Sequence, residues 1–326
     1  MPADIIADKS FYKAELIYQE IPGYPSCHGS SVAELPNGDL ITAWYAGAAE
    51  KAKDVAILVS RLPKNANTWT KPEILHDAPD LSEGNPVLYM DAHGRLWFFY
   101  NIMYGKMWND CRLYYRISED GGKNWGSEVT LIKVKGWITR NHPLTLGDGT
   151  MILPIHNEVL WSPAFMLTKD GGKTWRRTGT NLRVAGGAIE PALIRLSDNT
   201  LIAYLRTTTG KILMTTSKDN GEHWSAPRDT DLPNPNAAVE IVRLRNGHLV
   251  LAFNDSQVAR TPLTVALSLD EGKTWSHKRN LEDAYGEFSY PSIIQTEDGL
   301  IHVTYTYKRT HIKHAVFNEG WIMEEN

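Results

Sequence analysis

Twelve side chains that could bind or react with a polar ligand occupy matched places in this 326-residue chain, within segments that otherwise hold Val, Ile and Leu. Six stand where a strand would begin beside small or turn residues: His28, Asn85, His142, Glu190, Glu240 and Tyr290. Six more stand five residues into the strand that would follow: Tyr45, Asn101, His156, Arg206, Asn254 and Tyr305. The mixture of carboxylates, imidazoles, a guanidinium and phenols is typical of a ligand site with charges of both signs. The alternative is a water-filled channel, which needs polar walls but not this mixture, and we favour the ligand site.

A repeat of roughly fifty residues must bring these positions together. Four segments share the pattern Ser/Thr-x-Asp-x-Gly-x-x-Trp, a degenerate copy ends at Trp69, and a vestigial copy ends at Trp321. The six closing tryptophans are 56, 50, 49, 51 and 46 residues apart, a period typical of β-propeller blades. Ser, Thr and Asp hydrogen-bond their own backbone and Gly accepts positive φ, so each copy predicts a tight hairpin turn. The tryptophan would pack between neighbouring sheets, which gives these turns a structural role away from the site. The four full copies are Ser118–Trp125, Thr168–Trp175, Ser217–Trp224 and Ser268–Trp275.

A second set of turn residues, one in each repeat, predicts where the strands within the repeat lie. Gly or Asn stands ahead of an apolar run at Gly38, Gly94, Gly149, Asn199, Gly247 and Gly299. Because no segment holds a 3.6-residue period, helix should be nearly absent. We therefore predict an all-β fold, a single six-bladed β-propeller domain over residues 1–326. Residues 12–19 would supply the outer strand of the last blade and so close the ring.

Composition excludes some partners and leaves other properties open. The net charge is -4 and no run of Lys or Arg forms a stripe, which argues against nucleic acid. No apolar stretch approaches the about 20 residues that span a bilayer, so no membrane insertion is expected. The first residues lack the basic start and apolar stretch of a secretory signal. A cytoplasmic protein and a secreted one whose signal has been removed both fit. Two cysteines favour free thiols over a disulfide framework, and the oligomeric state is not predicted.

With these motifs, the chain resembles the sialidase superfamily over essentially its whole length. The Ser/Thr-x-Asp-x-Gly-x-x-Trp pattern is the Asp-box of that superfamily. Its members also keep an acidic residue after the first inner strand, a Glu followed by an Arg, an Arg ahead of an Asp-box, and a Tyr that opens the last blade. The residues that match here are Asp54, Glu190, Arg206, Arg260 and Tyr290.

The resemblance implies a role for each matched residue. Arg206 and Arg260 would clamp the carboxylate of an acidic sugar through forked hydrogen bonds. Tyr290 would be the nucleophile, with Glu190 taking the phenol proton. Asp54 would be the acid that protonates the leaving oxygen, and then the base that activates water. These roles need no cofactor, and no short-spaced His or Cys pattern predicts a metal site.

The first blade departs from the family pattern. Sialidases open it with an Arg that completes a three-arginine clamp, whereas this chain has His28-Gly29-Ser30. Either Arg309 or Arg140 replaces that arginine, or the carboxylate sits differently, or the substrate is another acidic sugar. His28 could also act in acid–base chemistry, or be structural. Further residues expected to bind the substrate are Asn85, His142, Glu240, His156 and Tyr305. Trp108 and Trp161 either stack on a sugar ring or pack in the core.

Three functions follow as hypotheses. The first is a retaining exo-glycoside hydrolase that removes a terminal acidic sugar, sialic acid or a relative, from a glycan. The second is a hydrolase or lyase that acts on a uronic acid in the same site, with His28, Tyr290 and Arg206 supplying acid, base and carboxylate neutralisation. The third is a glycan-binding propeller without catalysis.

Overall fold

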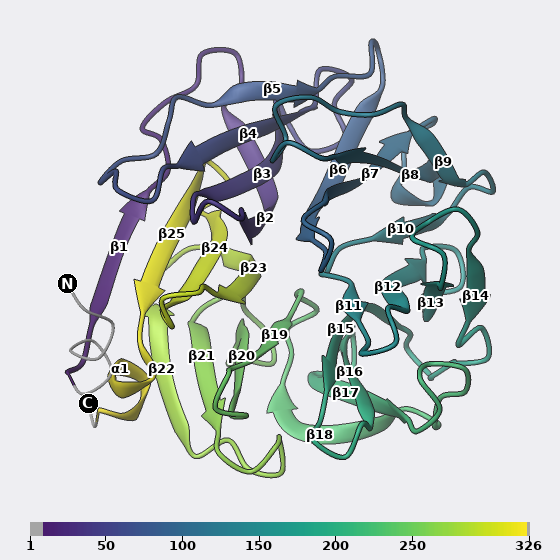
Figure 1. Cartoon of the computed structure of the whole chain (residues 1–326), viewed down its shortest axis with the longest axis vertical. Coiled ribbons are helices and arrows are strands. Elements are labelled where there is room, and N and C mark those ends of the chain that lie inside the picture. The colour runs from purple at the N-terminus through teal and green to yellow at the C-terminus, as the bar shows by residue number, and fades with distance from the viewer. Residues whose placement is uncertain (1–8, 325–326) are drawn as a thin grey trace.

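The computed structural model describes residues 9–324, in which six antiparallel sheets surround a common centre (Figure 1). This confirms the predicted six-bladed all-β propeller. The N-terminal residues on which the expected lack of a signal depends lie outside the described range. We number the blades in chain order and give the strands from the centre outward. Blade 1 is β2 (Ser26–Glu34), β3 (Leu40–Gly47), β4 (Ala56–Leu62) and β5 (Glu73–His76). Blade 2 is β6 (Ser82–Met90), β7 (Leu96–Met103), β8 (Cys111–Ser118) and β9 (Val129–Ile132).

The remaining blades repeat this order. Blade 3 is β10 (Trp137–Thr139), β12 (Met151–Asn157), β13 (Ser162–Thr168) and β14 (Arg176–Thr178), with β11 (Leu144–Thr145) also paired to β12. Blade 4 is β15 (Ala188–Arg195), β16 (Leu201–Thr207), β17 (Lys211–Ser217) and β18 (Arg228–Pro233). Blade 5 is β19 (Glu240–Arg243), β20 (Leu249–Asn254), β21 (Leu263–Ser268) and β22 (His277–Glu282). Blade 6 is β23 (Phe288–Gln295), β24 (Ile301–Tyr307), β25 (His311–Phe317) and β1 (Tyr12–Leu16).

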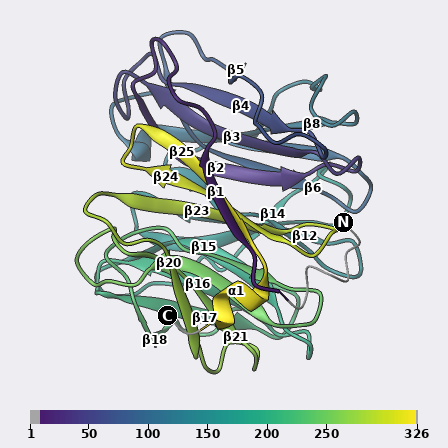
Figure 2. The ribbon, with the colours of Figure 1, turned by 90° about the vertical axis from the view of Figure 1, so that its left-hand side faces the viewer.

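The two ends of the chain meet in blade 6. Strand β1 pairs antiparallel with β25, from Tyr12 opposite Phe317 to Leu16 opposite Lys313, and Figure 2 shows β1 running along this blade. The pairing covers the edge that a ring of strands would otherwise leave open. Trp321 does not close a hairpin turn as its vestigial motif predicts. It lies in the short helix α1 (Glu319–Met323) and stacks on Tyr12 with ring centroids 4.4 Å apart.

The Asp-box turns have the hydrogen bonds that their residue types predict. In the copy after β8, the Ser118 hydroxyl donates to Asp120 (2.8 Å) and accepts from the backbone N of Gly122 (2.7 Å). The Asp120 carboxylate also accepts from the backbone N of Asn124 (2.8 Å). Backbone donors and the Ser118 and Asn124 side chains lower the pKa of Asp120 well below its usual range. These contacts hold each turn without help from a ligand.

The core lies between neighbouring blades rather than within one sheet. Buried aliphatic and aromatic side chains form a cluster at each of the six junctions between blades. Each motif tryptophan packs between its own blade and the blade before it, as predicted; these are Trp69, Trp125, Trp175, Trp224, Trp275 and Trp321. The blades thereby support one another and fix the start of every inner strand relative to the centre.

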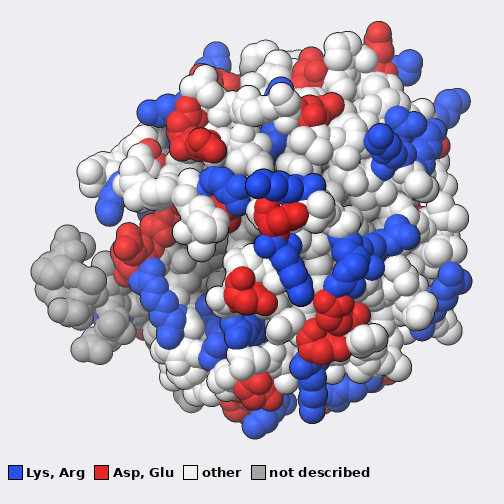
Figure 3. Space-filling view, turned by 45° about the vertical axis from the view of Figure 1, so that its right-hand side comes forward, with Lys and Arg blue, Asp and Glu red and all other residues white. Residues whose placement is uncertain are grey.

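Figure 3 shows one face of the surface, on which Lys and Arg side chains alternate with Asp and Glu. This mixture agrees with the small net charge of -4. Cys27 and Cys111 are both buried and free. Neither helix of the described part is long and apolar enough to cross a membrane.

Candidate active site

Four inner strands carry the same backbone distortion at the face where they begin. In β2, β6, β15 and β23 the pairing register shifts by one residue near the start of the strand. Each bulge holds one residue at positive φ: Gly29 (+62°), Asn85 (+46°), Glu190 (+52°) and Tyr290 (+55°). A residue other than glycine costs about 1–3 kcal/mol in this region, a strain that clusters at functional sites. The bulges re-aim the side chains of Asn85, Glu190 and Tyr290 toward the centre of the ring.

Tyr290 and Glu190 are joined through a buried arginine. Arg206 Nη1 donates to Glu190 Oε1 (3.0 Å) and to Tyr290 Oη (2.6 Å). Tyr290 Oη donates to the same Glu190 oxygen (3.2 Å). Glu190 and Arg206 come from blade 4 and Tyr290 comes from blade 6. Tyr290 is 84 residues from Arg206 and 100 residues from Glu190 in the sequence. The phenol therefore already points its proton at a carboxylate.

The charges around this group decide its protonation. Burial opposes ionisation of Glu190, but the positive charge of Arg206, with smaller contributions from His156 and Arg140, outweighs it and lowers the pKa of the carboxyl. Burial raises the pKa of Tyr290 above its ordinary value, although Arg206 acts in the opposite direction. At neutral pH the resting site therefore holds a carboxylate beside a neutral phenol. That is the arrangement of a base next to a nucleophile.

A chain of polar contacts continues from Arg206 around Tyr290. Arg206 Nε donates to Asn236 Oδ1 (2.8 Å), and Arg260 Nη2 donates to the Asn236 carbonyl (3.1 Å). Arg260 Nη1 donates to Glu287 Oε1 (2.8 Å), and Arg309 Nε donates to Glu287 Oε2 (2.9 Å). The guanidinium carbon of Arg260 lies 5.4 Å from the Tyr290 ring centroid. Arg206, Arg260 and Arg309 are thus linked in one chain of contacts that begins at the phenol, in the number expected of a carboxylate clamp.

The chain of contacts ends in the loop that joins β3 to β4. Arg309 Nη1 donates to Glu50 Oε2 (2.5 Å), and Trp108 Nε1 donates to Glu50 Oε1 (3.0 Å). Trp108 belongs to the short 3-10 helix η2 (Trp108–Asp110) between β7 and β8. Arg309 occupies the hairpin turn between β24 and β25, beside the place where the missing first-blade arginine is expected. Its backbone carbonyl accepts from Cys27 N (2.9 Å), the residue before His28.

His28 packs directly on Tyr290. The two ring centroids are 4.1 Å apart, and His28 is 2% exposed. Among the described residues, neither ring nitrogen of His28 has a hydrogen-bond partner. Burial, and after it the charges of the surrounding arginines beginning with Arg309, hold the pKa of His28 well below its ordinary value. The ring is therefore neutral at neutral pH, and it does not replace the charge of an arginine.

Arg140 supports the site from blade 3. Its Nη2 donates to the backbone carbonyls of Tyr290 (2.8 Å) and Pro291 (3.1 Å), and its guanidinium carbon lies 5.1 Å from the Tyr290 ring centroid. The arginine is 2% exposed. Its two hydrogen bonds stabilise the strained backbone at Tyr290. Within residues 9–324, the buried atoms Asn85 Oδ1 and Glu190 Oε2 also lack a partner, which leaves them available to a bound ligand.

Within residues 9–324, no hydrogen bond joins Asp54 to this network. It is exposed, and its Oδ2 accepts from the backbone N of Ala48 (3.1 Å) at the other end of the same loop. The loop therefore presents two carboxylates to solvent and site, Glu50 and Asp54. Glu50 is the one in contact with site residues.

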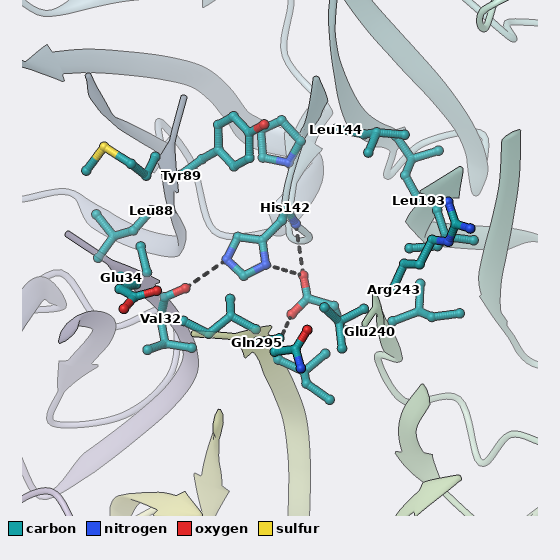
Figure 4. Close-up of a pocket in the computed structure, with 18 residues that line it drawn as sticks. Val32, Glu34, Leu88, Tyr89, His142, Leu144, Leu193, Glu240, Arg243 and Gln295 are labelled. Carbon is teal, nitrogen blue, oxygen red and sulfur yellow. Dashed lines mark hydrogen bonds and ion pairs between the residues drawn. The ribbon is translucent and has the colours of Figure 1, made fainter. Parts of the chain in front are cut away.

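His142 and Glu240 lie in a different place from the one that the repeat alignment predicts. They contact each other, His142 Nδ1 to Glu240 Oε1 at 2.9 Å, and line a cavity of about 370 Å³ (Figure 4). His142 Nε2 faces the Val32 carbonyl (3.1 Å), and Glu240 Oε2 accepts from Ile293 N (3.0 Å). Residues from all six blades line this cavity, and neither Tyr290 nor Glu190 does. The pair therefore fills the centre beneath the Tyr290 site.

Tyr305 was expected in the site but lies in the core. It is fully buried in the cluster between blades 5 and 6, and its hydroxyl donates to Glu282 (2.7 Å). The pairing explains the error, because Ser289, the residue before Tyr290, lies opposite Thr306. Adjacent side chains on a strand face opposite sides of the sheet. Thr306 therefore takes the predicted place, and its hydroxyl accepts from Gly29 N (3.0 Å).

Two other predicted residues lie beside the reacting group. His156 is fully buried, its Nε2 lies 2.9 Å from Glu158, and its charge contributes to the lowered pKa of Glu190. Trp161 lies with its ring centroid 6.0 Å from the Arg206 guanidinium carbon.

Sequence reasoning missed Glu50, Asn236 and Glu287, because they lie in loops outside the repeat. The one signal was charge: with Asp54 exposed and Glu240 paired to His142, only Glu190 among the predicted acidic residues is left to balance the three arginines. Within residues 9–324, no group of three or more His, Cys, Asp or Glu side chains is placed to hold a metal ion.

Comparisons with known proteins agree with the propeller fold. The family model described as BNR repeat-like domain matches residues 38–303. Comparison with curated proteins found no significant sequence match. Among solved structures, a protein of unknown function from Dyadobacter fermentans is similar, with 15% identity and a TM-score of 0.81 over 94% of this chain and 99% of the other. The intramolecular trans-sialidase from Ruminococcus gnavus, in complex with oseltamivir carboxylate, has 14% identity and a TM-score of 0.81 over 93% and 96%. The NanB sialidase from Streptococcus pneumoniae has 14% identity and a TM-score of 0.81 over 94% and 70%.

Proposed function

The chain belongs to the BNR repeat-like domain family, and we propose that it is a sialidase-like exo-glycosidase. Its fold, which solved sialidases share, supports this proposal. Its substrate would be a glycan that ends in an acidic sugar, sialic acid or a relative. The observation that carries this proposal is the group of Tyr290, Glu190 and Arg206, in which the phenol donates to a buried carboxylate and accepts from a guanidinium.

The reaction would begin with Tyr290 Oη attacking the anomeric carbon. Glu190 takes the phenol proton as the bond forms, since its carboxylate already accepts that proton in a hydrogen bond. A tyrosine suits a sugar whose anomeric carbon bears a carboxylate, because a neutral phenol approaches it without the repulsion that an Asp or Glu nucleophile would meet. The product of this step is a covalent glycosyl–tyrosine, an aryl glycoside, which water then hydrolyses with net retention of configuration.

The three arginines would bind the sugar carboxylate. Arg206, Arg260 and Arg309 come from blades 4, 5 and 6, and each is already held by a carboxylate or amide of the protein. These second contacts orient the guanidinium groups before substrate arrives, which reduces the entropy lost on binding. The acid that protonates the leaving oxygen would come from the loop of residues 48–55, which carries Asp54, the residue matched by the family pattern, and Glu50.

Release of 4-methylumbelliferone from its N-acetylneuraminic acid glycoside tests this function. Wild type should turn the glycoside over, and Tyr290→Phe should lose at least about 1,000-fold in kcat, a loss comparable to removal of other nucleophiles. The matched control is Tyr285→Phe, since Tyr285 is 98% exposed and away from the contacts described above. Equal activity of Tyr290→Phe and wild type would refute the proposal.

A uronic-acid substrate is the second candidate, and His28 favours it. Its neutral ring with two unpartnered nitrogens lies against the phenol, where a proton acceptor could serve an elimination. A panel of uronic-acid glycans separates the two reactions. A lyase would release an unsaturated product that absorbs in the near ultraviolet, and a hydrolase would not. Glycan binding without turnover, unchanged in Tyr290→Phe, would instead identify a binding protein.

A further inference from the structure

Two carboxylates of one loop are candidates for the acid–base residue of the proposed reaction, and their surroundings differ. Glu50 and Asp54 both lie between β3 and β4. Asp54 is exposed and accepts from a backbone N of its own loop. Glu50 is half-buried, with a side-chain exposure of 26%, and both of its oxygens accept from groups of other blades.

The negative charge of Glu50 acts on the phenol and on a ring packed beside it. Burial raises the pKa of Tyr290, and the charge of Glu50, after that of Glu190, acts in the same direction. The charge of Glu50 also adds to the burial that raises the pKa of Tyr45. Tyr45 packs edge-on against His28, which in turn packs on Tyr290. Glu50 is therefore within electrostatic range of the phenol, and it ends the chain of contacts that begins with Glu190 and Arg206.

From these contacts we infer that Glu50, rather than Asp54, is the acid–base residue of the proposed reaction. The inference rests on the proposed glycosidase function. In the first step the Tyr290–carbon bond forms while the bond from the anomeric carbon to the leaving oxygen breaks. The Glu50 carboxyl gives its proton to that oxygen, and Glu190 keeps the phenol proton. In the second step water attacks the anomeric carbon and gives a proton to Glu50, and Tyr290 leaves with the proton that Glu190 returns.

Arg309 couples this role to substrate binding. In the free protein Arg309 is shared between Glu287 and Glu50. A substrate carboxylate that binds Arg309 competes with Glu50 for the guanidinium, and a carboxylate that loses a cationic neighbour takes up a proton more readily. Glu50 would thus become an acid when the sugar is in place. Trp108 keeps it in position through its Nε1 donor.

The dependence on leaving group tests the assignment, because an acid catalyst matters most when the leaving oxygen is a poor one. We compare wild type, Glu50→Gln and Asp54→Asn on 4-methylumbelliferyl N-acetylneuraminic acid and on sialyllactose. Glutamine keeps an oxygen for Trp108 but has no proton to give. Glu50→Gln should lose about 100-fold or more in kcat/KM, which reports the first step, on sialyllactose, within the range for general acid catalysis. On the aryl glycoside kcat/KM should fall about 10-fold or less. Azide added to Glu50→Gln should raise aryl glycoside turnover and give a glycosyl azide.

Asp54→Asn should keep the wild-type ratio of the two rates. A loss of kcat/KM in Glu50→Gln that is equal for both substrates would show that Glu50 only positions Arg309, and would overturn the inference. A leaving-group dependence that appears in Asp54→Asn and not in Glu50→Gln would overturn it too, while leaving the proposed function intact. Wild type that hydrolyses neither substrate would overturn the proposed function, and the inference with it.

Discussion

Replacing Arg206 by methionine should destabilise the protein in a way that depends on pH. The guanidinium makes hydrogen bonds to Asn236, Glu190 and Tyr290 at 2.8, 3.0 and 2.6 Å. Methionine fills similar space but leaves Glu190, which is 3% exposed, without its closest cation. Breaking a buried ion pair by removing one partner costs about 3–5 kcal/mol. That is a large part of the about 5–15 kcal/mol by which a domain is stable.

The pH dependence follows from Glu190. Its folded-state pKa is lowered in wild type, so it contributes stability above about pH 4.3, the ordinary value, and this stability is lost as pH falls through the folded pKa. Without Arg206, burial dominates and should raise the folded pKa above the ordinary value. Protonation then relieves the variant, and the difference in unfolding free energy should shrink between pH 7 and pH 4.

Urea unfolding followed by tryptophan fluorescence at the two pH values measures this difference. The matched control is Arg176→Met, because Arg176 forms an ion pair with Glu222 on the surface with 55% of its side chain exposed. An exposed pair contributes at most about 1 kcal/mol. The Arg206→Met, Glu190→Gln double variant should recover part of the loss, because no buried charge remains unpaired. An Arg206→Met variant within about 1 kcal/mol of wild type at pH 7, or one with an equal deficit at pH 4, would refute the reasoning.

Two further predictions concern the frame of the propeller. The buried hydroxyl of Ser268 accepts from Gly272 N (2.7 Å) and donates to Asp270 (2.8 Å). Ser268→Ala should therefore lower the free energy of unfolding by about 1–3 kcal/mol. An unchanged urea midpoint would contradict this. Burial, with a smaller contribution from His314, holds the pKa of His302 well below 6.5 in the folded state. Below pH 6.5 the unfolded chain therefore binds a proton that the folded protein does not, which favours unfolding. His302→Gln should remove this effect and reduce the loss of stability between about pH 7 and pH 5. Equal pH profiles of His302→Gln and wild type in urea unfolding would contradict it.

The repeat made the fold predictable because each blade needs its own turn residues. Glycine or asparagine occurs at positive φ ahead of all six second strands, as at Gly38 (+82°) and Asn199 (+69°). The Asp-boxes set the period between blades. Trp321 departs from that rule because the chain ends its last repeat in a helix that packs on β1.

The site was predictable only where the repeat keeps its register. Glu190 and Tyr290 occupy the same bulge in blades 4 and 6, so their alignment held. Strand β19 shows no such shift and begins at Glu240, which moves that residue below the site. Likewise, Tyr305 misses the site by one residue, which on a strand reverses the direction of the side chain. Loop residues such as Glu50 follow no period and needed the structure.

Trapping the covalent intermediate tests most directly whether Tyr290 is the nucleophile. A 3-fluoro glycosyl fluoride of N-acetylneuraminic acid forms the glycosyl–enzyme readily, and its fluorine beside the anomeric carbon slows hydrolysis. Intact-mass spectrometry of the treated wild type should show one added sugar, peptide mapping should place it on Tyr290, and Tyr290→Phe should stay unmodified. Turnover of the aryl glycoside without an adduct, or an adduct on another residue, would contradict the account.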